Sequence, residues 1–140
     1  MASLFVYGTL CFTEITEKLT GKSFHSKKAI LKDYQRKQVK NADYPAIVKS
    51  SYSEVKGLLL HGVDRYSLKI ISFYEGSDYR CDDLTVWTNG KLVNAKVFVW
   101  NSNVEELENF DWNYDEFAQN LLKIYVEKVI SETLREFDSH

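Results

Sequence analysis

The chain has 140 residues, 44% of them hydrophobic, which is enough for one domain with a single core. Its 18 basic and 20 acidic residues give a formal charge of −2, which argues against binding to nucleic acid or to an anionic membrane surface. No signal peptide and no apolar run near the roughly 20 residues of a membrane span are visible, so we expect a cytoplasmic protein with no membrane partner.

The composition also predicts how the chain is organised. One proline and six glycines leave no stretch that resembles a linker, so we predict one domain over residues 1–140. The two cysteines, Cys11 and Cys81, are too few for the disulfide framework of a small secreted domain, and we interpret them as reduced thiols.

The first 100 residues are rich in β-branched and aromatic runs and predict strands. These strands are expected at residues 3–8, 29–39, 46–49, 55–63, 79–87 and 92–100. The pair Asn89-Gly90 lies between the last two and favours a tight hairpin, because both residue types readily take positive φ values.

Two short helices are expected among these strands. The first covers residues 13–19, with Thr13 as its N-cap and Gly21 ending it. The second covers residues 66–74, is capped by Asp64, and brings Glu75 to its C-terminal end.

The last third of the chain predicts a third helix. Asn113 and Glu116 resemble a capping box, and the helix is expected to end near Phe137. Apolar residues repeat along it at helical spacing: Phe117, Leu121, Tyr125, Val129 and Leu134.

Mixed strands, a hairpin and a C-terminal helix indicate an α+β fold. Six or so strands in so short a chain can curl into a small closed or nearly closed mixed β-barrel with a few flanking helices, which removes exposed strand edges. The periodicity does not give the strand order.

Several kinds of site have no support in the sequence. His25, His61 and His140 lie far apart without spaced cysteine or carboxylate partners, so no metal site is predicted. The chain contains no phosphate-binding loop and no dinucleotide-binding glycine turn, which favours a reaction without a cofactor.

A strand and turn near the N-terminus form the first candidate site. Residues 4–10, with the sequence Leu-Phe-Val-Tyr-Gly-Thr-Leu, read as a buried strand that runs into a Gly-Thr turn. On spacing alone the turn is consistent with a simple strand exit. It is also consistent with an anion cradle, in which successive N–H groups and the Thr9 hydroxyl bind a carboxylate or an oxyanion.

Glu75 is the second candidate and is equally open by composition. A carboxylate at a helix C-terminus opposes the helix dipole, so its position asks for a reason, although a surface glutamate is the simplest interpretation. Enclosure by Phe73, Tyr74 and Tyr79 would raise its pKa and suit it to general-base work. Pairing with Arg80 would oppose that shift.

The segments that carry chemistry occur together in a recognisable order, namely residues 4–10, 43–48, 55–59, 73–76 with 79–80, 86–87 and 112–117. This order resembles the gamma-glutamylcyclotransferase family, and specifically its AIG2-like branch. The resemblance runs from residue 4 to about residue 125.

The resemblance implies a compact α+β barrel with a pocket at one end and no metal or cofactor. It implies an enzyme that acts on a small gamma-glutamyl compound, in which the α-amine attacks the γ-carbonyl and releases 5-oxoproline and an amine or amino acid. Glu75 matches the residue that accepts the proton of the amine, and Tyr79 matches a pocket-lining aromatic residue. The residues that match the substrate-binding loop are Tyr7, Gly8, Thr9 and Leu10.

The chain departs from the family pattern in two places. Cys81-Asp82-Asp83 follows Arg80 where a more basic or apolar strand is expected, and the tail at residues 124–140 is long. The tail is interpreted as a surface helix, an edge cover or a self-association element.

Two other functions stay open beside the cyclotransferase. One is a binding module on the same fold that recognises a gamma-glutamyl or other small amino-acid ligand without turnover. The other is an acyl transferase that depends on Cys11, although Cys11 also reads as a small buried hydrophobic residue.

Overall fold

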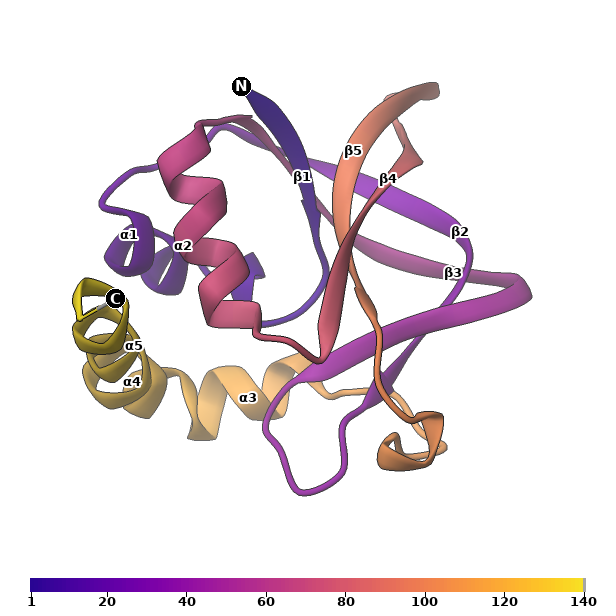
Figure 1. The fold of residues 1–140 in the computed structure, drawn as a ribbon. Coiled ribbons are helices and arrows are strands. Elements are labelled where there is room, and N and C mark those ends of the chain that lie inside the picture. The colour runs from indigo at the N-terminus through magenta and orange to yellow at the C-terminus, as the bar shows by residue number, and fades with distance from the viewer. Residues whose placement is uncertain (140) are drawn as a thin grey trace.

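Five strands curl into a closed barrel in the computed structural model, which describes residues 1–139 (Figure 1). The strands are β1 (Ala2–Val6), β2 (Ser26–Gln38), β3 (Pro45–Val63), β4 (Tyr79–Thr88) and β5 (Lys91–Trp100). Their order around the barrel is β1-β3-β2-β4-β5, and a parallel pairing of β1 with β5 closes it, whereas the other pairings are antiparallel. The predicted α+β class and small mixed barrel are therefore confirmed.

The barrel has five strands rather than six because the two strands expected at residues 46–49 and 55–63 are one continuous strand, β3. The pairing of β2 with β3 shifts register between Lys32 and Tyr34. There Asp33 and Tyr52 take φ values of 65° and 66°, and the Asp33 carboxylate accepts a hydrogen bond from the Tyr52 amide at 3.1 Å. This bulge bends both strands. The polar residues between the two expected strands therefore mark a bend within β3 rather than a break between two strands.

The predicted hairpin between β4 and β5 is confirmed. Asn89 and Gly90 have φ values of 51° and 73°, and Thr88 pairs with Lys91 on either side of them. Two consecutive positive φ values match the twist of the flanking strands.

Eight helical segments accompany the barrel within residues 1–139. The longer helices α1 (Thr13–Thr20), α2 (Arg65–Glu75) and α5 (Ile130–Asp138) gather on one side of it (Figure 1). The shorter elements are α3 (Tyr114–Asn120), α4 (Leu122–Ile124) and two 3₁₀ turns, η1 (Thr9–Cys11) and η2 (Val104–Glu106). The π-helical turn η3 (Tyr125–Val129) is additional and lies directly before α5. None of the helices described in residues 1–139 is long and apolar enough to cross a bilayer.

Two main cores hold these layers together. The alternating side chains of the strands fill the barrel interior, where Phe5, Leu59 and Val97 are almost completely buried. The second core lies between the barrel and the helices, where Leu4, Ile70 and Phe117 are equally buried. Strand β1 therefore supplies both cores, because successive side chains point to opposite faces.

The helix boundaries confirm most of the predicted caps. The Asp64 carboxylate accepts from the Ser67 amide at 3.2 Å and begins α2, and Gly21 ends α1 with a φ of 74°. The prediction that Thr13 caps α1 is wrong. Phe12 is the residue before the helix, and the Thr13 hydroxyl instead donates to the neighbouring Glu14 carboxylate at 3.2 Å.

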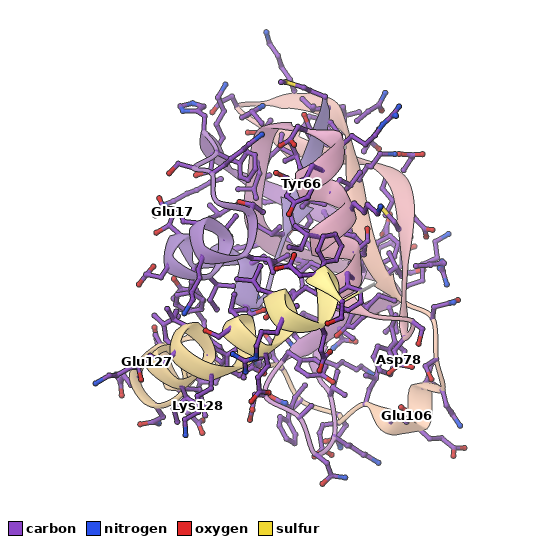
Figure 2. The ribbon with its side chains drawn as sticks, turned by 60° about the vertical axis from the view of Figure 1, so that its left-hand side comes forward. Glu17, Tyr66, Asp78, Glu106, Glu127 and Lys128 are labelled. Atoms are coloured by element: carbon purple, nitrogen blue, oxygen red, sulfur yellow. The ribbon has the colours of Figure 1, made fainter. Side chains whose placement is uncertain are left out.

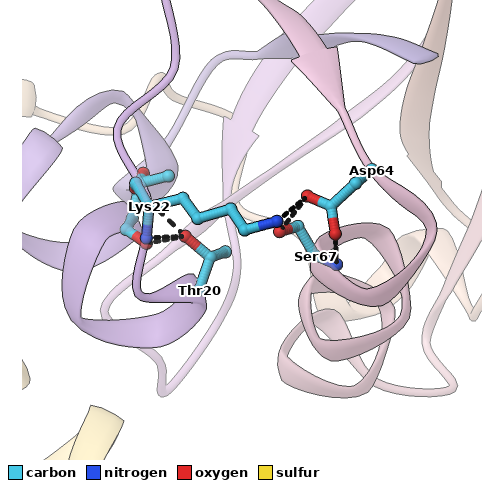
Figure 3. Close-up of polar contacts among 5 residues, drawn as sticks. Thr20, Lys22, Asp64 and Ser67 are labelled. Carbon is cyan, nitrogen blue, oxygen red and sulfur yellow. Dashed lines mark hydrogen bonds and ion pairs between the residues drawn. The ribbon is translucent and has the colours of Figure 1, made fainter. Parts of the chain in front are cut away.

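Polar contacts join the end of α1 to the start of α2 (Figure 3). The Lys22 ammonium lies 3.2 Å from the Asp64 carboxylate, which also accepts from the Ser67 hydroxyl at 2.6 Å. Thr20 contributes from the other side, because its hydroxyl accepts from the Lys22 amide at 3.2 Å. These contacts fix the first turn of α2, whose last residue is Glu75.

The C-terminal helix is interrupted rather than continuous. Asn113 caps α3 as predicted and accepts from the Glu116 amide at 2.9 Å, but Leu121 leaves helical geometry with a φ of −124°. The turn η3 follows, and the Ile130 amide donates to the Tyr125 carbonyl five residues earlier. The apolar repeat at every fourth position from Phe117 to Val129 is compatible with both an α-helical and a π-helical turn, so it did not predict the interruption.

Candidate active site

A cavity of about 160 Å³ lies where the end of β1, the end of α2 and the C-terminal helix meet. This is smaller than the roughly 300–1,000 Å³ typical of pockets for drug-sized ligands, so it suits a ligand of amino-acid or dipeptide size. All six residues proposed from the sequence line it: Tyr7, Gly8, Thr9, Leu10, Glu75 and Tyr79. Its other lining residues are Phe5, Val6, Tyr44, Pro45, Tyr74, Phe98, Tyr125, Val129 and Thr133.

The strand-turn and the acid are joined directly. The Thr9 hydroxyl and the Tyr74 hydroxyl form a hydrogen bond of 2.7 Å across 65 positions of sequence. Tyr74 immediately precedes Glu75, so this bond fixes the end of α2 against the turn. The two candidate segments therefore form one site.

The turn after β1 is a short 3₁₀ helix. The Cys11 amide donates to the Gly8 carbonyl at 3.0 Å, and the Phe12 amide donates to the Thr9 carbonyl at 3.2 Å. The amides at the start of such a helix have no partner within it, which is the arrangement that binds anions at helix N-termini. The turn thus brings main-chain donors to the wall of the pocket.

Gly8 is required by a close approach of Pro45. A Cβ atom added at Gly8 would lie 2.7 Å from Cγ and 2.9 Å from Cδ of Pro45. The proline ring is rigid and cannot move aside as a long side chain can. The glycine therefore allows the turn to pack against the start of β3.

We expect Gly8→Ala to lower the free energy of unfolding by about 1–3 kcal/mol, because it overpacks the contact with Pro45. Urea denaturation measures this loss. Pro45→Ala removes both clashing atoms, so the same Gly8→Ala change in that background should cost at least about 1 kcal/mol less. An equal cost in both backgrounds would contradict the steric explanation.

The Glu75 carboxyl combines burial with the lack of a partner. Glu75 is half-buried, and burial raises the pKa of its carboxyl from 4.5 to about 8. Within residues 1–139 no hydrogen bond or ion pair reaches this carboxylate, and Arg80 instead pairs with Asp82 at 2.9 Å. A carboxyl that exchanges a proton near neutral pH is suited to both general-base and general-acid work.

Aromatic hydroxyls surround Glu75 and remain neutral. Burial, followed by the charge of Glu75, raises the pKa of Tyr7 and Tyr79 above their usual range. The Tyr7 hydroxyl donates to the Phe98 carbonyl at 2.5 Å, and the Tyr79 hydroxyl donates to the Pro45 carbonyl at 2.8 Å. These phenols therefore position strands and present their rings to the pocket.

Arg36 supports the turn and is absent from the sequence-based candidates. Its guanidinium donates to the Tyr7 carbonyl at 2.7 Å, pairs with Asp111 at 2.8 Å and lies 5.5 Å above the Trp112 ring. No sequence motif identifies this arginine, because its contact with the Tyr7 carbonyl forms only when the barrel has folded.

The comparison with known families agrees with this geometry. The sequence profile described as gamma-glutamyl cyclotransferase, AIG2-like, matches residues 4–115. The chain belongs to this family.

Curated relatives of this AIG2-like chain come from Arabidopsis thaliana. AIG2-like protein D is 25% identical over 122 residues, which cover 85% of this chain and 80% of that protein. AIG2-like protein A is 26% identical over 129 residues, which cover 89% of this chain and 77% of that protein.

Solved structures share the fold of this AIG2-like chain. A solution structure of an Arabidopsis thaliana protein superposes with a TM-score of 0.70 at 24% identity, covering 91% of this chain and 87% of that one. A structure named gamma-glutamyl cyclotransferase gives a TM-score of 0.61 at 19% identity, covering 76% of this chain and 68% of that one.

Part of the pocket lies outside the family match. Tyr125, Val129 and Thr133 line the cavity from η3 and α5, beyond residue 115. The sequence signal for Tyr125 and Val129 is the apolar repeat of the last helix, which marks burial without telling a core position from a pocket wall. The tail interpreted as a surface helix is therefore also a wall of the site.

The family departures at Cys81, Asp82 and Asp83 do not reach the pocket. Asp82 pairs with Arg80, and Asp83 lies 2.8 Å from the Lys96 ammonium. None of the three lines the cavity among the residues described.

Cys11 does not line the pocket of this AIG2-like chain either. Its thiol donates weakly to the Val6 carbonyl at 3.5 Å, and burial raises its pKa to about 12. A thiol with so high a pKa is a poor nucleophile near neutral pH. Over residues 1–139, no three histidine, cysteine, aspartate or glutamate side chains gather as metal ligands.

Proposed function

We propose that this AIG2-like chain is a gamma-glutamyl cyclotransferase, which converts a small gamma-glutamyl compound into 5-oxoproline and a free amine or amino acid. The observation that carries the proposal is the Glu75 carboxyl, which has a pKa of about 8 and no hydrogen-bond or ion-pair partner within residues 1–139. It lies in one small cavity with the turn at Gly8 and Thr9. Membership of the family supports the same activity.

In the proposed reaction Glu75 moves two protons in succession and no cofactor takes part. The ionised carboxylate accepts a proton from the substrate α-ammonium, and the freed amine attacks the γ-carbonyl to form the ring C–N bond. The protonated Glu75 then gives this proton to the leaving nitrogen as the original amide C–N bond breaks. The ring nitrogen gives up its second proton by the same route to the departing amine, which leaves as an ammonium ion. Atoms and charge balance without a further reactant.

The turn has a separate role in this proposal. The main-chain donors at residues 8–10 hold the substrate carboxylate or the oxyanion that develops on the γ-carbonyl, and each oxyanion donor typically contributes about 3–4 kcal/mol. Tyr7, Leu10 and Tyr79 supply apolar surface that keeps the glutamyl chain folded, which favours ring closure because both reacting groups belong to one molecule.

The direct test incubates the purified protein with gamma-glutamyl dipeptides, gamma-glutamylamines and glutathione, and detects 5-oxoproline by mass spectrometry. We expect release from at least one compound. Binding without release across the panel would contradict the enzyme and favour the alternative, a binding module on the same fold.

Cys11→Ser separates this proposal from an acyl transferase that depends on Cys11. Because the thiol lies outside the cavity and has a pKa of about 12, we expect the variant to keep its kcat/KM within a few-fold of the unmodified protein. Complete loss of activity in a folded Cys11→Ser protein would make the thiol the nucleophile and overturn the role of Glu75.

A further inference from the structure

We propose that residues 121–138 form the wall that selects the group attached to the gamma-glutamyl moiety, with Val129 as the specificity-determining residue. This inference rests on the proposed function and deepens it. It concerns a segment that lies entirely beyond the family match at residues 4–115.

One face of the segment reaches the cavity and the other faces solvent. Tyr125, Val129 and Thr133 follow each other at intervals of four residues, and all three line the pocket. Glu127 and Lys128 lie between them in sequence and point away from the molecule (Figure 2). The contribution of this helix to the site is therefore a narrow stripe of side chains.

The π-helical turn lies within this stripe. Its hydrogen bond spans five residues, from the Ile130 amide to the Tyr125 carbonyl, so it widens the helix between Tyr125 and Val129. Residues four apart share one face in this turn, as they do in an α-helix. Tyr125 and Val129 can thus face the same cavity while Ile130 stays completely buried in the core.

Contacts on both sides hold the wall in place. The Lys18 ammonium of α1 donates to the Val126 carbonyl of the π-helical turn at 2.5 Å. Near the end of α5, the Phe137 ring meets the Phe73 ring of α2 edge-on at 5.4 Å. Because these contacts hold the wall to α1 and α2, it can exclude a ligand that is too large. A segment without such contacts would move aside.

The wall lines the cavity with uncharged side chains. The Thr133 hydroxyl donates to the Val129 carbonyl at 2.9 Å, so it is committed within the helix. Val129 brings only methyl groups, and the pKa of Tyr125 is raised, mainly by burial and then by the charge of Asp43, so its hydroxyl stays neutral. The turn and Glu75 are assigned to the glutamyl group, so the cavity face of residues 121–138 is left to contact the attached group. It distinguishes one attached group from another by size.

The test compares two uncharged probes, L-γ-glutamyl methylamide and L-γ-glutamyl benzylamide, in the full-length protein. Val129→Phe should lower kcat/KM for the benzylamide at least tenfold more than for the methylamide. Val129→Ala should shift the ratio of the two by at least threefold towards the benzylamide. Because each result is a ratio within one protein preparation, partial unfolding of a variant does not alter it.

Ile124→Phe and Ile124→Ala are the matched controls. Ile124 is also β-branched, lies one residue before the π-helical turn and is 49% exposed, so both variants should leave the ratio unchanged. Equal effects of the Val129 variants on both probes, or the same shifts in the Ile124 variants, would overturn the inference while leaving the proposed function intact.

Failure of the proposed function gives a different pattern. If the protein binds both probes by calorimetry but releases no 5-oxoproline, the cyclotransferase is contradicted, and the ratio of the two dissociation constants then decides whether Val129 selects by size. If it neither binds nor converts either probe, both proposals are overturned.

Discussion

Glu75→Gln should lower 5-oxoproline release by roughly a hundred- to ten-thousand-fold, the range expected when a general acid–base is lost. Glutamine keeps the size of the side chain but cannot take the proton that activates the substrate amine. The loss should appear in kcat/KM for every compound that the protein converts, because the same proton transfer precedes each ring closure. Mass-spectrometric detection of 5-oxoproline over time measures it.

The pH profile identifies the group that is lost. In the unmodified protein, kcat/KM should rise with pH through about 8 as Glu75 ionises in the free enzyme. Glu127→Gln is the matched control, since Glu127 is exposed on the solvent side of the same helical wall, and it should keep both the rate and the profile. A folded Glu75→Gln protein with full activity would contradict the proposed role of Glu75.

The same substitution should make the protein more stable at alkaline pH, by up to about 5 kcal/mol, on the order of 15 °C in Tm. Burial raises the pKa of Glu75 from 4.5 to about 8, so the folded state holds a proton that the unfolded chain releases between these values. The contribution of Glu75 to stability is therefore greatest below pH 4.5 and falls as the pH rises to about 8, where it levels off. Glutamine does not titrate and avoids this loss.

Thermal unfolding at pH 4.5 and pH 8.5 measures the effect. The Tm difference between Glu75→Gln and the unmodified protein should be small at the lower pH and clearly positive at the higher one. Glu127→Gln should show no such growth with pH. A Glu75→Gln protein that is less stable at pH 8.5 would mean that the ionised carboxylate is stabilised by its surroundings, which is incompatible with a raised pKa.

Local sequence signals predicted much of the barrel because each strand and cap depends on residues close in sequence. The Asn89-Gly90 hairpin and the Asp64 cap formed where expected, since their geometry is decided within a few residues. The union of two expected strands into β3 was missed, because the bulge at Asp33 and Tyr52 forms only when β2 and β3 pair. The cap at Thr13 failed because its hydroxyl has a competing neighbour in Glu14.

The candidate site shows the same contrast between features that nearby residues decide and features that form only when distant segments pack together. The sequence could nominate Thr9 and Glu75 as residues suited to the chemistry, but the bond from Thr9 to Tyr74 joins residues 65 positions apart and has no local signature. The burial that raises the Glu75 pKa was stated only as a condition, because enclosure is a property of packing. Gly8 was identified for its freedom to approach a ligand, whereas the structure adds a second reason, the nearness of Pro45.

The pocket is lined partly by residues within the family match and partly by the C-terminal helix beyond it, and this has a consequence for how such proteins diverge in evolution. The acid and the turn lie on α2 and β1, within the stretch that the family shares, while Tyr125, Val129 and Thr133 come from a helix outside it. Substitutions along that one stripe change the cavity without disturbing a strand or the path of a proton. A lineage can in this way exchange one ligand for another over few mutational steps and keep its chemistry.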